Sequence, residues 1–250
     1  MKKISDNVYV ETGKQGCNHG FVTTTEGVVM IDAPQKSSDA EEWREIIDSK
    51  GELIYIINME YHIDHVASLH LFSGRLISHN WTRDALKAQK FRLADITFSD
   101  RMKLHLGEHT FELIHLPGHT PGETAVYIPE ESVLFTGDNI FYKVQTFLQD
   151  ALPFDWCNSL EVMKEIDADI LVPGHGEVCG KEYISEQTEF IKEWIDAVRG
   201  AIDGGLSKKE AADKISFLDR YPMDVGLKSF GKTLQKMNVN RLYDILKEEV

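Results

Sequence analysis

Short apolar runs separated by turns dominate the first two thirds of the chain and predict a β-rich core. Residues 20–24 and 27–32 are two such runs, and Glu26-Gly27 between them predicts a hairpin turn. The remaining predicted strands are residues 7–10, 53–57, 75–78, 110–115, 125–128, 133–136 and 169–172. Helical spacing of Ala40, Trp43, Ile46 and Ile47 predicts a helix over residues 37–49 between two of these strands.

The pattern changes after Gly176, where apolar positions recur at helical spacing. Helices are predicted over residues 182–202, 207–217 and 235–249. Ser207 with Glu210 forms a capping box at the start of the second. The chain shows no internal repeat and no Pro/Ser-rich linker, so we expect one α/β domain over residues 1–250. Its core would span about residues 1–180, and a helical tail of about 181–250 would pack on it.

Four potential metal ligands lie within six residues, Glu60-Tyr61-His62-Ile63-Asp64-His65, directly after the predicted strand 53–57. An extended chain points alternate residues the same way, so Glu60, His62 and Asp64 are expected to converge while His65 faces elsewhere. Such a division suits two neighbouring metal ions better than one. Asp64 is also expected to cap a short helix that runs to about residue 72.

Three further motifs place a ligand-type side chain where an apolar run ends in a turn. They are Pro117-Gly118-His119, Thr136-Gly137-Asp138 and Pro173-Gly174-His175, and Ile31-Asp32 is a weaker fourth case. The glycines let the backbone bend tightly and approach an ion closely. Ligands on loops at strand ends, held by a rigid sheet, are a common way to build a site.

This ordered set resembles the metallo-β-lactamase superfamily, whose pattern is His-x-His-x-Asp-His, then Gly-His, Asp or Cys, and Gly-His. The resemblance covers about residues 7–180 and implies a four-layer αββα sandwich with the metals at one edge. It places Glu60, His62 and His119 at one metal site. Asp64, His65 and His175 would hold the second, and Asp138 would bridge both. The implied nucleophile is a metal-bridging hydroxide, which Asp64 both ligates and orients as the catalytic residue.

Glu60 departs from the family pattern, because a carboxylate stands where the family has an imidazole. Two divalent ions are expected, with zinc first, and the added oxygen donor makes iron or manganese plausible alternatives. Flavodiiron proteins of the same superfamily also carry a Glu in this cluster, although their Glu aligns with His62. Glu60 either ligates the metal or turns away and leaves the first site half-formed.

Substrate contacts are expected from aromatic and polar residues near the cluster. Residues 139–156 follow Asp138 and are rich in aromatics, so Tyr142 or Lys143 is a candidate to hold an oxyanion or carboxylate. Tyr61 and His19 are candidates to border the cleft. The apolar residues of this region predict a partly hydrophobic small molecule: Phe141, Phe147, Leu148, Phe154 and Trp156.

Composition narrows the partners and the compartment. A formal net charge of −14 disfavours nucleic acid, and no apolar run is long enough for a membrane span. The N-terminus has no signal-peptide pattern, and the three cysteines, Cys17, Cys157 and Cys179, are far apart. We therefore expect reduced thiols, a cytoplasmic protein and a small-molecule substrate. The oligomeric state stays open, with a homodimer as one option.

The leading hypothesis is a dinuclear metal-dependent hydrolase of a small ester, thioester, lactone or amide. The first alternative is a di-iron protein that handles oxygen or nitric oxide, which Glu60 motivates and which would need an external electron donor. The second is a catalytically silent sensor that keeps the fold. A β-lactamase is disfavoured by the missing signal-peptide pattern, and a glutathione thioesterase by the lack of a clear basic cluster in the tail.

Overall fold

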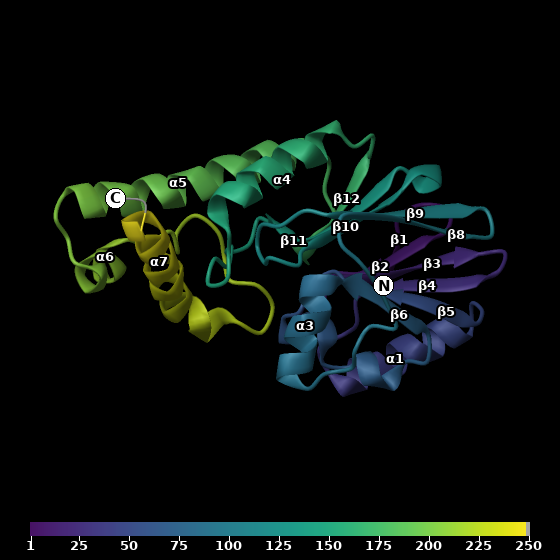
Figure 1. Cartoon of the computed structure of the whole chain (residues 1–250). Helices are drawn as coiled ribbons and strands as arrows, with labels where there is room; N and C mark the ends of the chain where they lie inside the picture. The colour runs from purple at the N-terminus through teal and green to yellow at the C-terminus, as the bar shows by residue number, and fades with distance from the viewer. Residues whose placement is uncertain (249–250) are drawn as a thin grey trace.

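The computed structural model describes residues 1–248 and contains two β-sheets that face each other (Figure 1). The first sheet has seven strands in chain order: β1 Lys2–Lys3, β2 Val8–Glu11, β3 His19–Thr24, β4 Gly27–Ile31, β5 Leu53–Ile57, β6 Arg75–His79 and β7 Ile96–Phe98. Strands β1 to β4 pair antiparallel, and β4 to β7 pair parallel. The hairpin predicted between β3 and β4 is confirmed, but its turn is Thr25-Glu26 instead of Glu26-Gly27. Gly27 begins β4 with φ +136°, which L-residues rarely reach.

The second sheet has five strands in the order β12-β11-β10-β9-β8. Their bounds are β8 Arg101–Leu106, β9 His109–His115, β10 Thr124–Ile128, β11 Val133–Tyr142 and β12 Ile170–Gly176. All neighbours pair antiparallel except β11 and β12, which are parallel and therefore need a crossover connection. The helix α4 (Pro153–Glu165) supplies it.

Helices cover the outer face of each sheet, which completes four layers (Figure 1). Helices α1 (Ser37–Asp48) and α3 (Asn80–Gln89) lie on the first sheet, and α4 and α5 (Tyr183–Asp203) lie on the second. Apolar side chains of both sheets, such as Val29, Phe111 and Phe135, form a buried cluster between them. The predicted αββα sandwich is confirmed.

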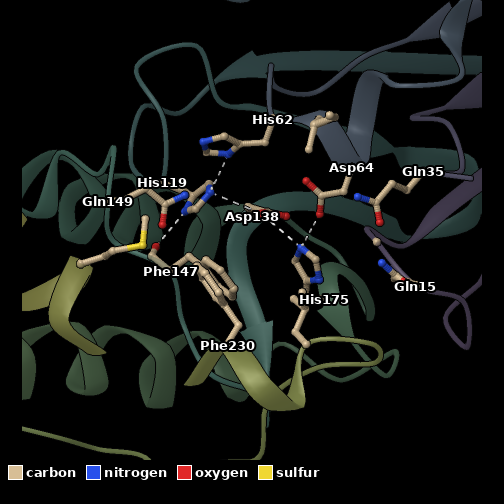
Figure 2. Close-up of a pocket in the computed structure, with 14 residues that line it drawn as sticks. Gln15, Gln35, His62, Asp64, His119, Asp138, Phe147, Gln149, His175 and Phe230 are labelled. Carbon is tan, nitrogen blue, oxygen red and sulfur yellow. Dashed lines mark hydrogen bonds and ion pairs between the residues drawn. The ribbon is translucent and has the colours of Figure 1, made fainter. Parts of the chain in front are cut away.

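The tail packs on the second sheet's outer layer. Helices α6 (Lys208–Lys214) and α7 (Gly231–Glu248) share a hydrophobic cluster with α4, α5 and β11. The predicted capping box of Ser207 and Glu210 is present at the start of α6. Between α6 and α7 the chain passes through the short helix η3 (Lys228–Phe230) beside the edge of the sandwich where the ligand-type residues gather (Figure 2).

The structure corrects two local predictions near that edge. The helix expected to start at Asp64 and reach residue 72 is wrong: α2 spans only Ile63–Val66, its N-cap is His62, and a 3-10 turn, η1, follows at Leu69–Leu71. The strand predicted over residues 133–136 continues to Tyr142. Strands β7 and β8 and helices α3 and α4 were not predicted. The apolar periodicity of α4 is weak, and in α3 the large apolar side chain of Trp81 is 60% exposed.

Candidate metal centre

The ligand-type side chains meet where the carboxyl ends of several strands reach one edge of the sandwich. Glu60 and His62 follow β5, and His119 follows β9. Asp138 lies inside β11, and His175 near the end of β12. The register between β11 and β12 shifts on both sides of Gly137, which adopts φ +57°. This irregularity re-aims the strand at Asp138, a common role of bulges beside functional sites.

The first group of potential ligands comprises His62, His119 and Asp138. His119 Nε2 lies 3.1 Å from His62 Nδ1 and 3.4 Å from Asp138 Oδ2. The opposite ring nitrogens are held from behind. His62 Nε2 donates to Asp150 Oδ2 at 2.9 Å, and His119 Nδ1 donates to the carbonyl of Phe147 at 2.9 Å. Both rings therefore present one unprotonated nitrogen to the centre of the cluster when a metal binds.

The second group comprises Asp64, His65 and His175. His175 Nε2 lies 3.3 Å from both Asp64 Oδ2 and Asp138 Oδ2, so Asp138 stands between the two groups (Figure 2). Behind these rings, His65 Nδ1 donates to Asp32 Oδ2 at 2.6 Å. His175 Nδ1 donates to Asp224 Oδ2 at 2.7 Å. All four histidines of the cluster thus have an oxygen acceptor behind them.

The prediction that His65 faces away from Glu60, His62 and Asp64 is wrong. Because a helix begins at Ile63, the chain is no longer extended there, and His65 Nε2 lies 3.1 Å from Asp138 Oδ1. Consecutive residues point to opposite faces of a strand, but on a helix they are only about 100° apart, so Asp64 and His65 can both face the cluster.

Glu60 lies beneath both groups and is fully buried. Its Oε2 accepts from the backbone N–H of His62 at 2.8 Å and lies 3.2 Å from His62 Nδ1. Its Oε1 lies 3.3 Å from His65 Nε2. Glu60 therefore turns toward the cluster. The structure groups it with His65 and Asp138, whereas the family pattern places it with His62 and His119.

The donor set fits divalent metal ions. Three buried atoms lack any hydrogen-bond partner among the described residues of the cluster, namely Glu60 Oε1, His65 Nε2 and Asp138 Oδ1. Buried polar atoms without partners are costly, and these three lie together and point at one another. A cation between them would satisfy all three. Four imidazoles and three carboxylates suit zinc, and the carboxylates also suit iron or manganese.

The electrostatics of the cluster also favour bound positive charge. Burial by itself lowers the pKa of His62, but the charge of Glu60 and the hydrogen bond with Asp150 outweigh it and raise that pKa to about 11. Burial raises the pKa of Asp138, yet the neighbouring charges of His175 and His65 hold it well below its usual range. The carboxylates thus stay ionised and favour protons on His62, His65 and His175, which a metal ion can displace. Burial lowers the pKa of His119, so that ring is neutral more readily.

Several supporting residues were missed by the sequence analysis. Asp150 and Asp224 have no motif around them, and Asp224 lies 49 residues after its partner His175, so no local signal could have found them. Glu123 is fully buried and accepts from the backbone N–H of Asp138 at 2.9 Å. Its carboxyl has a pKa well above the usual range because of burial and the nearby charges of Glu60 and Asp138.

The four predicted substrate contacts do not line the cavity that opens onto the cluster: His19, Tyr61, Tyr142 and Lys143. His19 is buried against Trp43 and its Nδ1 donates to the carbonyl of Cys17. Because β11 continues to Tyr142, that side chain packs on Tyr183, and Lys143 lies over Tyr142. Tyr61 packs beside His62 with ring centroids 4.9 Å apart, outside the cavity lining.

Most of the apolar residues that were expected to line the substrate cavity do not line it. Only one of the five does, namely Phe147. Phe141 and Trp156 are buried behind it against His119, and Leu148 is fully buried. Phe154 is 38% exposed on another face. The cysteines are free, as predicted, and Cys17 packs with its Sγ 3.2 Å from the carbonyl oxygen of Asp64.

A cavity of about 240 Å³ opens onto the cluster (Figure 2). Five of the potential ligands reach it: His62, Asp64, His119, Asp138 and His175. Glu60 and His65 do not, so they belong to its floor. The tail closes one side of the cavity through Leu227, Phe230 and Met237. No helix among residues 1–248 is long and apolar enough to cross a membrane.

Replacing Asp224 with Asn is expected to weaken metal binding about 10- to 100-fold, the usual cost of altering the hydrogen-bond partner behind a metal-binding histidine. The amide removes the charge that orients His175. Competition with a chelator of known affinity measures the change. The exposed Asp219, in the same segment of the tail, supplies the control variant Asp219→Asn. Equal metal affinity of Asp224→Asn and the unmodified protein would contradict the assigned role.

Comparison with known proteins agrees with this architecture. The sequence profile of the metallo-beta-lactamase superfamily matches residues 12–175. The beta-lactamase-like protein 2 homolog of Caenorhabditis elegans is 25% identical over 222 residues, covering 80% of this chain and 73% of the relative. The hydroxyacylglutathione hydrolase of Brucella anthropi is 25% identical over 206 residues, covering 80% and 74%. A solved metallo-beta-lactamase from Pontibacter korlensis superposes with a TM-score of 0.70 at 21% identity, covering 76% of this chain and 97% of that one.

Proposed function

This chain belongs to the metallo-β-lactamase superfamily, and on that premise we propose that it is a dinuclear metal-dependent hydrolase of a small ester, thioester, lactone or amide. The observation that carries the proposal is the cluster of four histidines, each with an oxygen acceptor behind it, around three unpartnered buried atoms. Relatives that include a hydroxyacylglutathione hydrolase support hydrolysis as the reaction type.

In the proposed arrangement His62, His119 and Asp138 hold one ion, Asp64, His65 and His175 hold the second, and Glu60 supports both from below. Bound metal ions supply Lewis acidity and lower the pKa of a coordinated water. Asp64 is the catalytic candidate, because it lines the cavity and its side chain is 21% exposed. The Asp64 carboxylate would orient the attacking water, accept its proton and pass that proton to the leaving group.

Metal analysis and activity screening test this proposal together. Protein purified without oxygen is expected to contain about two ions per chain. Removing them with a chelator should abolish hydrolysis, and adding back zinc, iron or manganese one at a time should restore it and identify the native metal. A content below about one ion per chain, or no hydrolysis in a panel of esters, thioesters, lactones and amides, would count against a dinuclear hydrolase.

Glu60 favours one second candidate, a di-iron protein that handles oxygen or nitric oxide. It is buried with both oxygens directed at histidines of the cluster, which adds a third carboxylate to the donor set. The same anaerobic preparation distinguishes the two. Iron-loaded protein that reduces oxygen or nitric oxide with an added electron donor, and hydrolyses nothing in the panel, would select this candidate.

A further inference from the structure

The walls of the cavity carry no positively charged side chain among residues 1–248. Apart from the five potential ligands, all of its lining residues are uncharged. Three of them are glutamines, Gln15, Gln35 and Gln149. Five are large and apolar: Ile63, Phe147, Leu227, Phe230 and Met237. A substrate thus meets the metal cluster, neutral amides and apolar surface.

These walls are divided into two sides (Figure 2). Gln15 and Gln35 lie beside Asp64 and His175, at the second metal group. Phe147 lies beside His119, at the first group, and Phe230 of the tail lies below it. The two phenyl rings are stacked, with their centroids 6.3 Å apart. Gln149 also lies on this second side, beside His119. A molecule that spans the cluster therefore has one end between Gln15 and Gln35 and the other against two phenyl rings with one neutral amide near them.

The cations nearest to the cavity are engaged or directed elsewhere. Lys14 pairs with Asp39 at 3.1 Å and with Glu42 at 3.2 Å. Arg241 donates to the carbonyl of Ala151 at 2.9 Å. Lys228 is exposed on the tail and does not line the cavity. Within residues 1–248, no Lys or Arg therefore lines the cavity to pair with a carboxylate at the end of a substrate.

We propose that the cavity selects uncharged acyl substrates with one apolar arm, which lies against Phe147 and Phe230 while the polar end contacts Gln15 and Gln35. This inference rests on the proposed hydrolase. Water adds across the acyl–oxygen bond of an ester, giving a carboxylic acid and an alcohol, so no further reactant is needed. A carboxylate on the arm would leave water for a wall of two phenyl rings that offers it no cation, which is costly.

Two esters of matched shape test the selectivity on the zinc-loaded protein. The 4-nitrophenyl ester of 4-methylpentanoic acid ends in an isopropyl group, and 4-nitrophenyl hemisuccinate ends in a carboxylate at the same place. We expect kcat/KM to be at least about tenfold higher for the neutral ester, since a site rejects groups that it leaves unpaired. Equal values, or a preference for the hemisuccinate, would overturn the inference.

Variants assign the preference to its walls. Phe230→Ala should lower kcat/KM for the neutral ester about tenfold, and the exposed Phe154→Ala, on another face, serves as the matched control. Lys228→Ala should leave the ratio of kcat/KM for the neutral ester to kcat/KM for the hemisuccinate unchanged. Phe230→Arg places a cation on the wall that holds the arm and should narrow the kcat/KM ratio of the two esters by improving the hemisuccinate. A kcat/KM ratio that stays fixed in both Phe230→Ala and Phe230→Arg would contradict the assignment to this wall.

Calorimetric binding separates this inference from the proposed function. The amides 4-methylpentanamide and succinamate repeat the two shapes without a good leaving group. If neither ester is hydrolysed, the hydrolase proposal fails, yet tighter binding of the neutral amide still supports the selectivity. Tighter or equal binding of succinamate overturns it, whatever the outcome of the hydrolysis assays.

Discussion

Replacing Asp138 with Asn is expected to lower hydrolysis by about a thousandfold and to release bound metal. Asp138 faces three histidines, His65, His119 and His175, at 3.1 to 3.4 Å. The amide has the same size but loses the charge and one metal-binding oxygen. Metal ions contribute several kcal/mol of transition-state stabilisation, and each 1.36 kcal/mol is tenfold in rate, which gives the expected magnitude. Steady-state kinetics and metal content measure the two effects.

Asp169→Asn is the matched control, because Asp169 is exposed directly before β12, the strand paired with β11. It should retain metal and activity. An Asp138→Asn variant that keeps two ions and most of its activity would exclude Asp138 as the shared ligand. Circular dichroism of both variants confirms that lost activity does not reflect an unfolded chain.

Adding a single methyl group at Gly174 is expected to cost about a hundredfold in activity and about 1–3 kcal/mol of stability. A Cβ on Gly174 would lie 1.8 Å from Asp138 Oδ1 and 2.9 Å from the backbone nitrogen of Asp138. The carboxylate must therefore move by more than an ångström, and β11 and β12 must separate. Kinetics of Gly174→Ala and its unfolding in urea measure the two losses.

Gly200→Ala is the control for that substitution. Gly200 lies in α5, and a Cβ there would meet no atom within 4 Å. Alanine in a helix reduces the freedom of the unfolded chain, so this variant should be as stable as the unmodified protein or slightly more stable. Full activity in Gly174→Ala would show that β11 and β12 yield without displacing Asp138.

The sequence was informative where a residue's position depends on its local motif. His119, Asp138 and His175 each follow an apolar run and a glycine, and the structure places all three in one cluster. Gly174 leaves room for the Asp138 carboxylate, because a Cβ there would lie 1.8 Å from Oδ1. The close approach of the glycine backbone to an ion stays a prediction. A strand that ends at a sheet edge leaves little freedom for the next residue, so its direction follows from the pattern.

Other features depend on contacts between distant segments. His65 was assigned the wrong direction because alternation holds only while the chain is extended, and here a helix starts at Ile63. Tyr142 and Lys143 were expected in the cavity, but hydrogen bonding to β12 extends β11 past Asp138 and carries Tyr142 beyond the cluster. Asp150 and Asp224 reach their histidines only through the folded chain, which no short pattern encodes.

The position of the tail has a consequence for how related chains are compared. The superfamily profile matches residues 12–175, a span that contains every potential ligand of the cluster. Asp224, Phe230 and Met237, which hold His175 and close the cavity, all lie beyond it. Two homologues can therefore share the complete metal signature and still differ in what they hydrolyse. Grouping them by the segment that aligns with residues 216–240 should sort them by substrate better than grouping them by the signature.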